Sequence, residues 1–138
     1  MKHIEVVAAV ILYGEQILCV QRGATRYDYT SFKYEFPGGK VEKGETPEAA
    51  LLREIREELQ LGITIRSPFL TVEHTYPNFS IRLHSYLCTC ADTRLTLTEH
   101  IDAKWMPADL IATLDWAEAD IPVVDKIVYE GVEITQID

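Results

Sequence analysis

Three glutamates at helical spacing are the residues of this chain best suited to chemistry. Glu54, Glu57 and Glu58 fall within one short segment, and at 100° per residue they share one face of a helix. Like charges three or four positions apart cost about 0.2–0.5 kcal/mol per pair. A divalent cation would reverse that cost, because hard cations prefer carboxylate oxygens as ligands. The spacing therefore predicts a helix face that binds metal.

The helix that must present these glutamates has clear boundaries in the sequence. Thr46 suits the N-cap, Pro47 suits the first helical position, and Gly62 follows the expected end near Leu59. A neighbouring apolar arc can bury against a core, and it consists of Leu51, Leu52, Ile55 and Leu59. The sequence predicts an amphipathic helix over residues 47–59, anchored on one side and anionic on another.

Two adjacent glycines, Gly38 and Gly39, precede this helix. Without a Cβ, their backbone can approach a ligand or a metal ion closely. The acidic face by itself has a second interpretation, in which it is solvated and paired with Arg53 and Arg56. A glycine turn beside an acidic helix favours a site for metal and phosphate.

The turn and the helix together carry the pattern of a known signature. Gly39 is followed by five residues, Glu45, seven residues, Arg53-Glu54, and then Glu57-Glu58. This arrangement resembles the Nudix box, so the chain is identified as a member of the Nudix hydrolases. It departs from the box at Gln60, where the family usually has glycine.

The resemblance extends over nearly the whole chain. Segments outside the box are similar to the MutT branch, and they are residues 5–10, 21–22, 34–40, 105 and 119–122. Within that branch, Glu99-His100, Trp116 and the Ala-Asp-x-Pro segment are most similar to the CTP and 5-methyl-dCTP pyrophosphohydrolases.

The resemblance implies a metal site. Glu54, Glu57 and Glu58 would bind Mg²⁺, or Mn²⁺ in its place, together with the Gly38 carbonyl, and Glu54 is also the candidate base. Glu99, six residues before Trp105, stands where MutT-like enzymes have a further metal-binding glutamate; a solvated loop acid is the alternative.

Further residues would support the site and the phosphates. The resemblance implies that Glu45 supports the helix or the site and that Arg53 hydrogen-bonds a box carboxylate. Arg22 and Lys40 are candidate phosphate contacts beside Gly39, with solvated surface cations as the alternative.

The base pocket is expected elsewhere in the chain. Asp120 stands where MutT-like proteins contact the base edge, and Tyr34, Phe36 and Tyr76 are candidate stacking or wall residues. An ionised Asp120 only accepts hydrogen bonds, so it fits the cytosine amino group or the paired donors of guanine. The alternatives are a helix N-cap for Asp120 and core positions for the three aromatic residues.

These roles predict a Mg²⁺-dependent pyrophosphohydrolase that converts a nucleoside triphosphate and water into a monophosphate and pyrophosphate. The expected substrate is CTP or a modified dCTP, with 8-oxo-dGTP as the alternative. Other nucleoside-diphosphate-linked substrates and a nucleotide-binding module without catalysis stay open. The module is disfavoured because Glu54, Glu57 and Glu58 are all present.

Composition limits the other function classes. The 138 residues, 47% apolar, predict one domain over residues 1–138. A net charge of −9 argues against binding a nucleic-acid polymer, because phosphate backbones need basic patches. No leader or membrane-length apolar stretch is visible, so we expect a cytoplasmic location. We expect a monomer or a homodimer. Cys19, Cys88 and Cys90 are expected to be reduced structural thiols.

The remaining segments complete a fold of the α/β (α+β) class. Strands are expected over residues 4–13, 16–22, 34–36, 63–73, 79–90 and 103–106, and further helices over 107–114 and 121–130. Their order suggests a mixed, mostly antiparallel sheet with helices on both faces. The family resemblance implies the Nudix α/β/α sandwich.

Overall fold

The centre of the fold is β1 (Lys2–Tyr13), whose side chains alternate between two cores. In the computed structural model, which describes residues 1–132, Ala8 and Val10 pack on one side of β1, while Val7 and Ala9 pack on the other. A strand that buries side chains on both faces needs a covering layer on each. The sequence of β1 therefore requires a three-layer architecture.

The strands around β1 form a mixed sheet. Its order is β3-β2-β1-β6-β5, with β4 paired to β1 and β7 paired to β2. The strands are β2 (Gln16–Gln21), β3 (Tyr34–Glu35), β4 (Gly38–Lys40), β5 (Ile63–Thr75), β6 (Phe79–Cys90) and β7 (Asp102–Pro107). In the part of the chain that the structure describes, β1 and β6 run parallel and the other ladders are antiparallel. The predicted mixed, mostly antiparallel sheet is confirmed.

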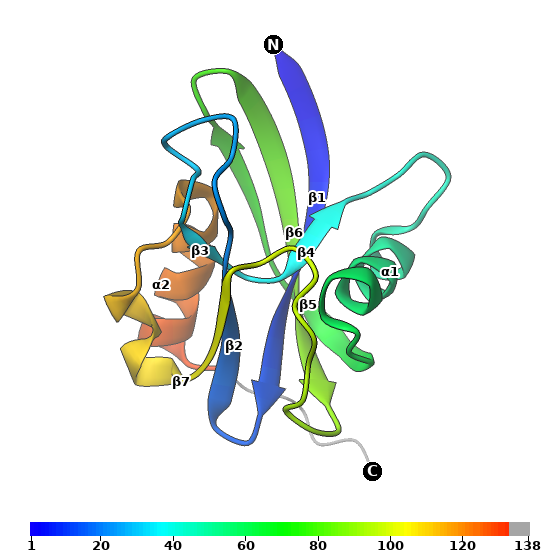
Figure 1. The fold of residues 1–138 in the computed structure, drawn as a ribbon, viewed down its shortest axis with the longest axis vertical. Coiled ribbons are helices and arrows are strands. Elements are labelled where there is room, and N and C mark those ends of the chain that lie inside the picture. The colour runs from blue at the N-terminus through cyan, green and yellow to red at the C-terminus, as the bar shows by residue number, and fades with distance from the viewer. Residues whose placement is uncertain (133–138) are drawn as a thin grey trace.

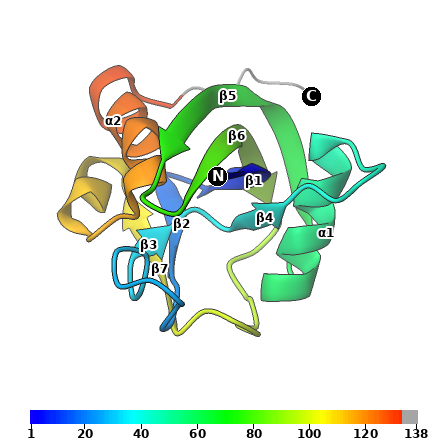
Figure 2. The same ribbon diagram turned by 90° about the horizontal axis from the view of Figure 1, so that it is seen from above.

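Two α-helices cover opposite faces of this sheet (Figures 1 and 2). α1 (Pro47–Leu59) buries Leu51, Ile55 and Leu59 in the core on one side. α2 (Ile121–Glu130) buries Val123, Val124 and Ile127 in the core on the other. The α/β/α sandwich is confirmed, and α1 is fixed against β1 and β4, where the predicted site lies. Leu52, which we expected in the buried arc, is 44% exposed.

The two ends of α1 differ in how well the sequence predicted them. The Thr46 side chain accepts a hydrogen bond from the Ala49 amide at 3.1 Å, so the expected N-cap is confirmed. At the other end the cap is Gln60, with φ 51° and ψ 40°, and not Gly62. Gln60 adopts the left-handed conformation that glycine adopts most easily, and the helix still ends at Leu59.

The segment after β7 is wound more tightly than we expected. The α-helix predicted over 107–114 is a 3₁₀-helix, η1 (Ala108–Thr113), followed by a second short one, η2 (Glu118–Asp120). The Leu114 amide bonds the Ile111 carbonyl at 3.2 Å, three residues back, as 3₁₀ geometry requires. This compact path brings Asp120 to the start of α2.

The three cysteines and the length of the helices are the remaining features of the fold. Cys19 and Cys88 are free thiols buried in the two cores, and Cys90 is partly buried. Burial raises the pKa of both Cys19 and Cys88 to about 12, which keeps them protonated. Across residues 1–132, no helix has both the length and the apolar character to cross a membrane.

The left-handed cap of α1 makes a stability prediction. We expect Gln60→Gly to raise the free energy of unfolding by about 1 kcal/mol, because a side chain in this conformation is strained by roughly that amount. Arg56→Gly, at an exposed helical position of α1, should lower it by about 1 kcal/mol. Urea denaturation measures both, and a loss of stability in Gln60→Gly would contradict the strain argument.

Candidate active site

Arg53 connects β4, the strand that contains Gly38 and Gly39, to α1, which we call the box helix because it carries most of the Nudix box. Its Nε donates to Glu45 Oε2 at 2.6 Å and its Nη2 donates to Glu45 Oε1 at 2.9 Å, so the ion pair is bidentate. Nη2 also donates to the Lys40 carbonyl at 3.1 Å, and Nη1 donates to Glu57 at 3.1 Å. The Arg53 hydrogen bonds lower the pKa of Glu45 to about 2. These contacts place Arg53 and Glu45 beside the predicted ligand Glu57, and their supporting roles stay predictions.

The two glycines of β4 stand where no side chain fits. A Cβ on Gly38 would overlap the backbone of Val7 and Ala8 in β1, and a Cβ on Gly39 would overlap the carboxyl group of Glu54. The first overlap is with rigid backbone and the second with a movable side chain. The absence of a side chain at Gly38 therefore allows β4 to pair closely with β1, whereas its absence at Gly39 leaves space for the Glu54 carboxyl group.

Several glutamates near β4 influence the pKa values of one another. Burial first, and then the charges of Glu54, Glu35 and Glu99, raise the pKa of Glu58 to about 9. Burial also raises the pKa of Glu54, with Glu57 and Glu99 adding to the effect. Glu58 Oε1 is buried and has no hydrogen-bond partner among the described residues. A buried carboxylate oxygen without a partner is costly, and a bound cation would satisfy it.

These carboxylates are not arranged as a closed metal site. Within residues 1–132, no group of three or more His, Cys, Asp and Glu side chains has an arrangement that could hold a metal ion. Arg53 Nη1 instead lies 3.1 Å from Glu57 and 3.6 Å from Glu54. The available ligands are nevertheless all oxygens, which is the donor set that Mg²⁺ and Mn²⁺ prefer. Together with the unpartnered Glu58 oxygen, this chemistry fits a hard cation.

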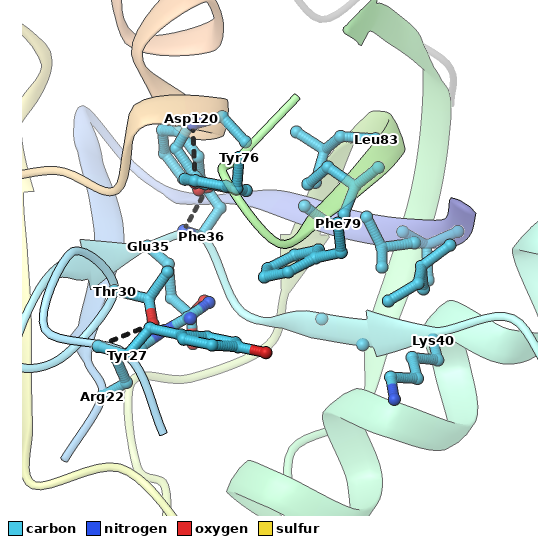
Figure 3. A pocket seen from close by; sticks show the side chains of 18 of the residues that line it. Arg22, Tyr27, Thr30, Glu35, Phe36, Lys40, Tyr76, Phe79, Leu83 and Asp120 are labelled. Atoms are coloured by element: carbon cyan, nitrogen blue, oxygen red, sulfur yellow. Dashed lines mark hydrogen bonds and ion pairs between the residues drawn. The ribbon is translucent and has the colours of Figure 1, made fainter. Parts of the chain in front are cut away.

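A cavity of about 480 Å³ joins this region to the predicted base pocket. Glu58, Gly39 and Lys40 line it at one end, and Asp120 and Tyr76 line it at the other. Figure 3 shows Lys40 and Asp120 at opposite sides of the cavity. The volume falls within the usual range of ligand pockets, about 300–1,000 Å³. Of the glutamates of α1, Glu58 lines the same cavity as Asp120, whereas Glu54 and Glu57 are not among its lining residues.

Asp120 is the most deeply buried acid of the cavity, at 5% exposure. Its Oδ1 accepts a hydrogen bond from the Phe36 amide at 3.1 Å (Figure 3). Asp120 occupies the N-cap position of α2, as the alternative interpretation predicted, but its side chain makes no capping hydrogen bond. Burial, followed by the charge of Glu35, raises the pKa of Asp120 to about 8. We therefore expect the carboxyl group to hold a proton at neutral pH, in contrast to the ionised Asp120 that the sequence analysis assumed.

The three predicted aromatic residues have different positions. Phe36 and Tyr76 line the cavity. The Tyr76 hydroxyl accepts a hydrogen bond from the Ala119 amide at 3.0 Å. Tyr34 is absent from the lining, and its hydroxyl donates to Asp102 at 2.7 Å in the core. The structure thus brings two of the three to Asp120.

Tyr27 and Phe79 line the cavity as well, and the sequence analysis missed both. Their ring centroids are 5.8 Å apart and their planes are tilted by 32° (Figure 3). Tyr27 belongs to the loop between β2 and β3, and Phe79 begins β6. The aromatic residues of that loop, Tyr27 and Tyr29, were the available signal.

A second network, also missed, is centred on Glu35. Arg22 Nε donates to Glu35 Oε1 at 3.1 Å and Nη2 contacts the same oxygen, while His100 Nε2 lies 3.0 Å from Oε2. Burial opposes ionisation of Glu35, but His100 and Arg22 hold its pKa below the usual value. Arg22 and Lys40, the two predicted phosphate contacts, both line the cavity. The charge of Arg22 is already paired with Glu35, whereas the Lys40 side chain is exposed.

The structure is an α/β/α sandwich in which carboxyl groups of α1 lie beside β4, next to a cavity of about 480 Å³. A family model described as NUDIX domain matches residues 2–127. The chain belongs to this family, as its sequence resemblance predicted, and is therefore a hydrolase that acts on phosphoric anhydride bonds. Nudix hydrolases generally need a divalent metal ion, usually Mg²⁺.

Known proteins with named activities and a solved structure are similar to this chain. The CTP pyrophosphohydrolase of Escherichia coli is 35% identical over 125 residues, which is 91% of each chain. The 8-oxo-dGTP diphosphatase of the same organism is 30% identical over 92% of this chain and 98% of that protein. The solution structure of MutT from methicillin-resistant Staphylococcus aureus has a TM-score of 0.74 and 43% identity, covering 95% of this chain and all of that one.

The contact between Gly39 and Glu54 makes a prediction about activity. Gly39→Ala should displace the Glu54 carboxyl group, and misplacing a reacting group by about 1 Å can cost roughly 100-fold in rate. We expect about that loss of nucleotide hydrolysis with a nearly unchanged melting temperature. Gly62→Ala is the matched control, since its Cβ would come no closer than 3.6 Å to Arg56. Equal rates of hydrolysis for the two variants would contradict a role of the Glu54 carboxyl group in the reaction.

The proton on Asp120 makes a prediction about pH. Its pKa of about 8 in the fold exceeds the unfolded value near 3.9, so its contribution to stability is lost as pH rises from about 4 to about 8. Asp120→Asn removes this titration. The free energy of unfolding of the variant, minus that of the wild type, should therefore increase with pH, by up to about 1.4 kcal/mol per pH unit.

Denaturation at pH 5 and pH 8 measures this difference. The same change at Asp125, an exposed residue of α2, is the control. A difference for Asp120→Asn that does not change with pH would mean that Asp120 is ionised in the fold.

Proposed function

We propose that this protein is a Mg²⁺-dependent nucleoside triphosphate pyrophosphohydrolase that prefers CTP or a modified dCTP. One observation carries the proposal: a single cavity extends from Glu58 and Gly39 to Asp120. A nucleotide in it would place its phosphates beside the box helix and its base beside Asp120. The 35% identity to a CTP pyrophosphohydrolase over 91% of each chain supports this substrate class.

The residues at the phosphate end have distinct tasks. Bound Mg²⁺ would neutralise phosphate oxygens and lower the pKa of a water molecule; Glu54, Glu57, Glu58, Glu99 and the Gly38 carbonyl are the groups that would hold it. The exposed Lys40 would contact the phosphate chain. Water attacks the β-phosphorus, the nucleoside monophosphate leaves, and a box glutamate, for which Glu54 is the candidate, accepts the proton of the water.

At the base end, the proton on Asp120 changes which groups it can bind. A neutral carboxyl group offers one donor and one acceptor, whereas a carboxylate only accepts. Cytosine presents an amino donor beside a ring acceptor, and guanine presents a ring donor beside a carbonyl acceptor. Asp120 is complementary to both patterns.

A second candidate substrate is therefore 8-oxo-dGTP. The 30% identity to an 8-oxo-dGTP diphosphatase over 98% of that protein favours it specifically. The Phe36 and Tyr76 side chains in the same cavity would contact either base through their apolar surface.

The test is pyrophosphate release with Mg²⁺ from CTP, dCTP, 5-methyl-dCTP, dGTP and 8-oxo-dGTP. We expect the highest kcat/KM for a cytosine nucleotide. A preference for 8-oxo-dGTP would select the second candidate. Tight binding of a nucleotide without turnover of any would refute the enzymatic function and favour a binding module.

Glu58→Gln tests the carboxylate assignment within the same assay. Burial raises the pKa of Glu58 to about 9, so in the absence of metal the change replaces a neutral carboxyl group with a neutral amide of similar size. The fold should therefore stay intact, while Mg²⁺-dependent turnover falls by about 100-fold or more. Glu48→Gln is the matched control, because it makes the same change at an exposed position in the first turn of α1. Near-native turnover in folded Glu58→Gln would overturn the assignment.

A further inference from the structure

The loop between β6 and β7, residues 91–101, lies against the end of α1. In Figure 1 it runs from the end of β6 past α1 to β7. This loop carries Glu99, an exposed acid. Glu99 can bind a cation together with a glutamate of α1 only if a restraint keeps the loop at the end of α1.

Thr98, the residue before Glu99, supplies such a restraint. Its backbone amide donates to the Glu58 carbonyl at 3.1 Å. Its hydroxyl donates to the Glu57 carbonyl at 2.9 Å and lies 3.2 Å from the Glu58 carbonyl. The last carbonyls of a helix lack partners within the helix. Thr98 therefore bonds the backbone of two predicted metal ligands directly.

Glu99 is also held from its other side. His100 Nε2 lies 3.0 Å from Glu35, and the Ile101 amide donates to the Gln21 carbonyl at 2.9 Å. The His100 side chain is only 4% exposed. Glu99 thus lies between a residue fixed to α1 and residues fixed to β2 and β3, and little freedom is left to its backbone.

The hydroxyl of Thr98 is the part of this arrangement that depends on a side chain. Thr96 provides the comparison, because its backbone amide bonds the Leu59 carbonyl at 2.9 Å. Within residues 1–132, the Thr96 hydroxyl has no hydrogen bond. Removing the hydroxyl at position 98 breaks a contact with α1, whereas removing it at position 96 breaks none.

We propose that Thr98 is a positioning residue, whose hydroxyl holds Glu99 beside Glu58 so that the two carboxylates bind one divalent cation. This inference rests on the proposed function, since it assigns a metal-binding role to the box helix. Thr98 acts through Glu99 and contacts neither metal nor substrate. It differs from a simple helix cap, which would stabilise α1 without affecting cation affinity.

The first test is Mn²⁺ binding to the full chain without nucleotide, followed by electron paramagnetic resonance. Thr98→Val should weaken Mn²⁺ binding by about 10-fold, which is typical when a group that orients a ligand is lost. Thr98→Ser, which keeps the hydroxyl, and Thr96→Val should stay within about twofold of the wild type. Wild-type affinity in Thr98→Val, or no Mn²⁺ binding by the wild type, would overturn the inference.

A double-mutant cycle separates positioning from capping. If Thr98 acts through Glu99, Thr98→Val should cause no further loss of Mn²⁺ affinity in a Glu99→Gln background. Additive losses would mean that Thr98 acts independently of Glu99 and would overturn the inference. Melting temperatures of all variants show whether each is folded.

The same titrations are independent of the proposed enzymatic activity. If the wild type hydrolyses no nucleotide but Thr98→Val still loses Mn²⁺ affinity through Glu99, the proposed function fails and the positioning role stands. If turnover occurs while the Mn²⁺ titrations of wild type and Thr98→Val coincide, the function stands and the positioning role fails.

Discussion

The ion pair between Arg53 and Glu45 is the contact on which the site depends. It closes the turn between β4 and α1, and the same guanidinium bonds the Lys40 carbonyl and Glu57. One cation thereby fixes a strand, a turn and a helix face. Because Arg53 also lies near Glu54, it offsets repulsion between carboxylates that would otherwise destabilise the helix.

The acids of this chain are concentrated where stability alone would not place them. Glu58 is partly buried beside other acids, and its buried Oε1 has no partner among the described residues. Asp120, which lines the same cavity, is buried, and this raises its pKa to about 8. Under the proposed function, burial of an acid would thus prepare one end of the cavity for a cation and the other end for hydrogen bonding to a base.

How much of this could be read from the sequence depends on the distance over which each feature acts. The helix over residues 47–59 and its N-cap at Thr46 are local patterns, and both are confirmed. The contact of His100 with Glu35 joins positions 65 residues apart, and no local pattern contains it. The raised pKa of Asp120 follows from burial of η2 against Phe36, which is 84 positions away in the chain, so it could not be inferred from residue type. Tyr34 and Phe36 lie two positions apart, yet only Phe36 lines the cavity.

Gln60 has a consequence for how such sites are found in other sequences. The end of α1 requires a left-handed backbone, and glutamine supplies it with φ 51° at a cost of roughly 1 kcal/mol. The requirement at this position is therefore a backbone angle and not the absence of a side chain. A search pattern that insists on glycine here would reject this chain, although its helix ends in the right place. A pattern that records the permitted dihedral region, and the residues able to adopt it, would include asparagine, aspartate and glutamine variants of the same site.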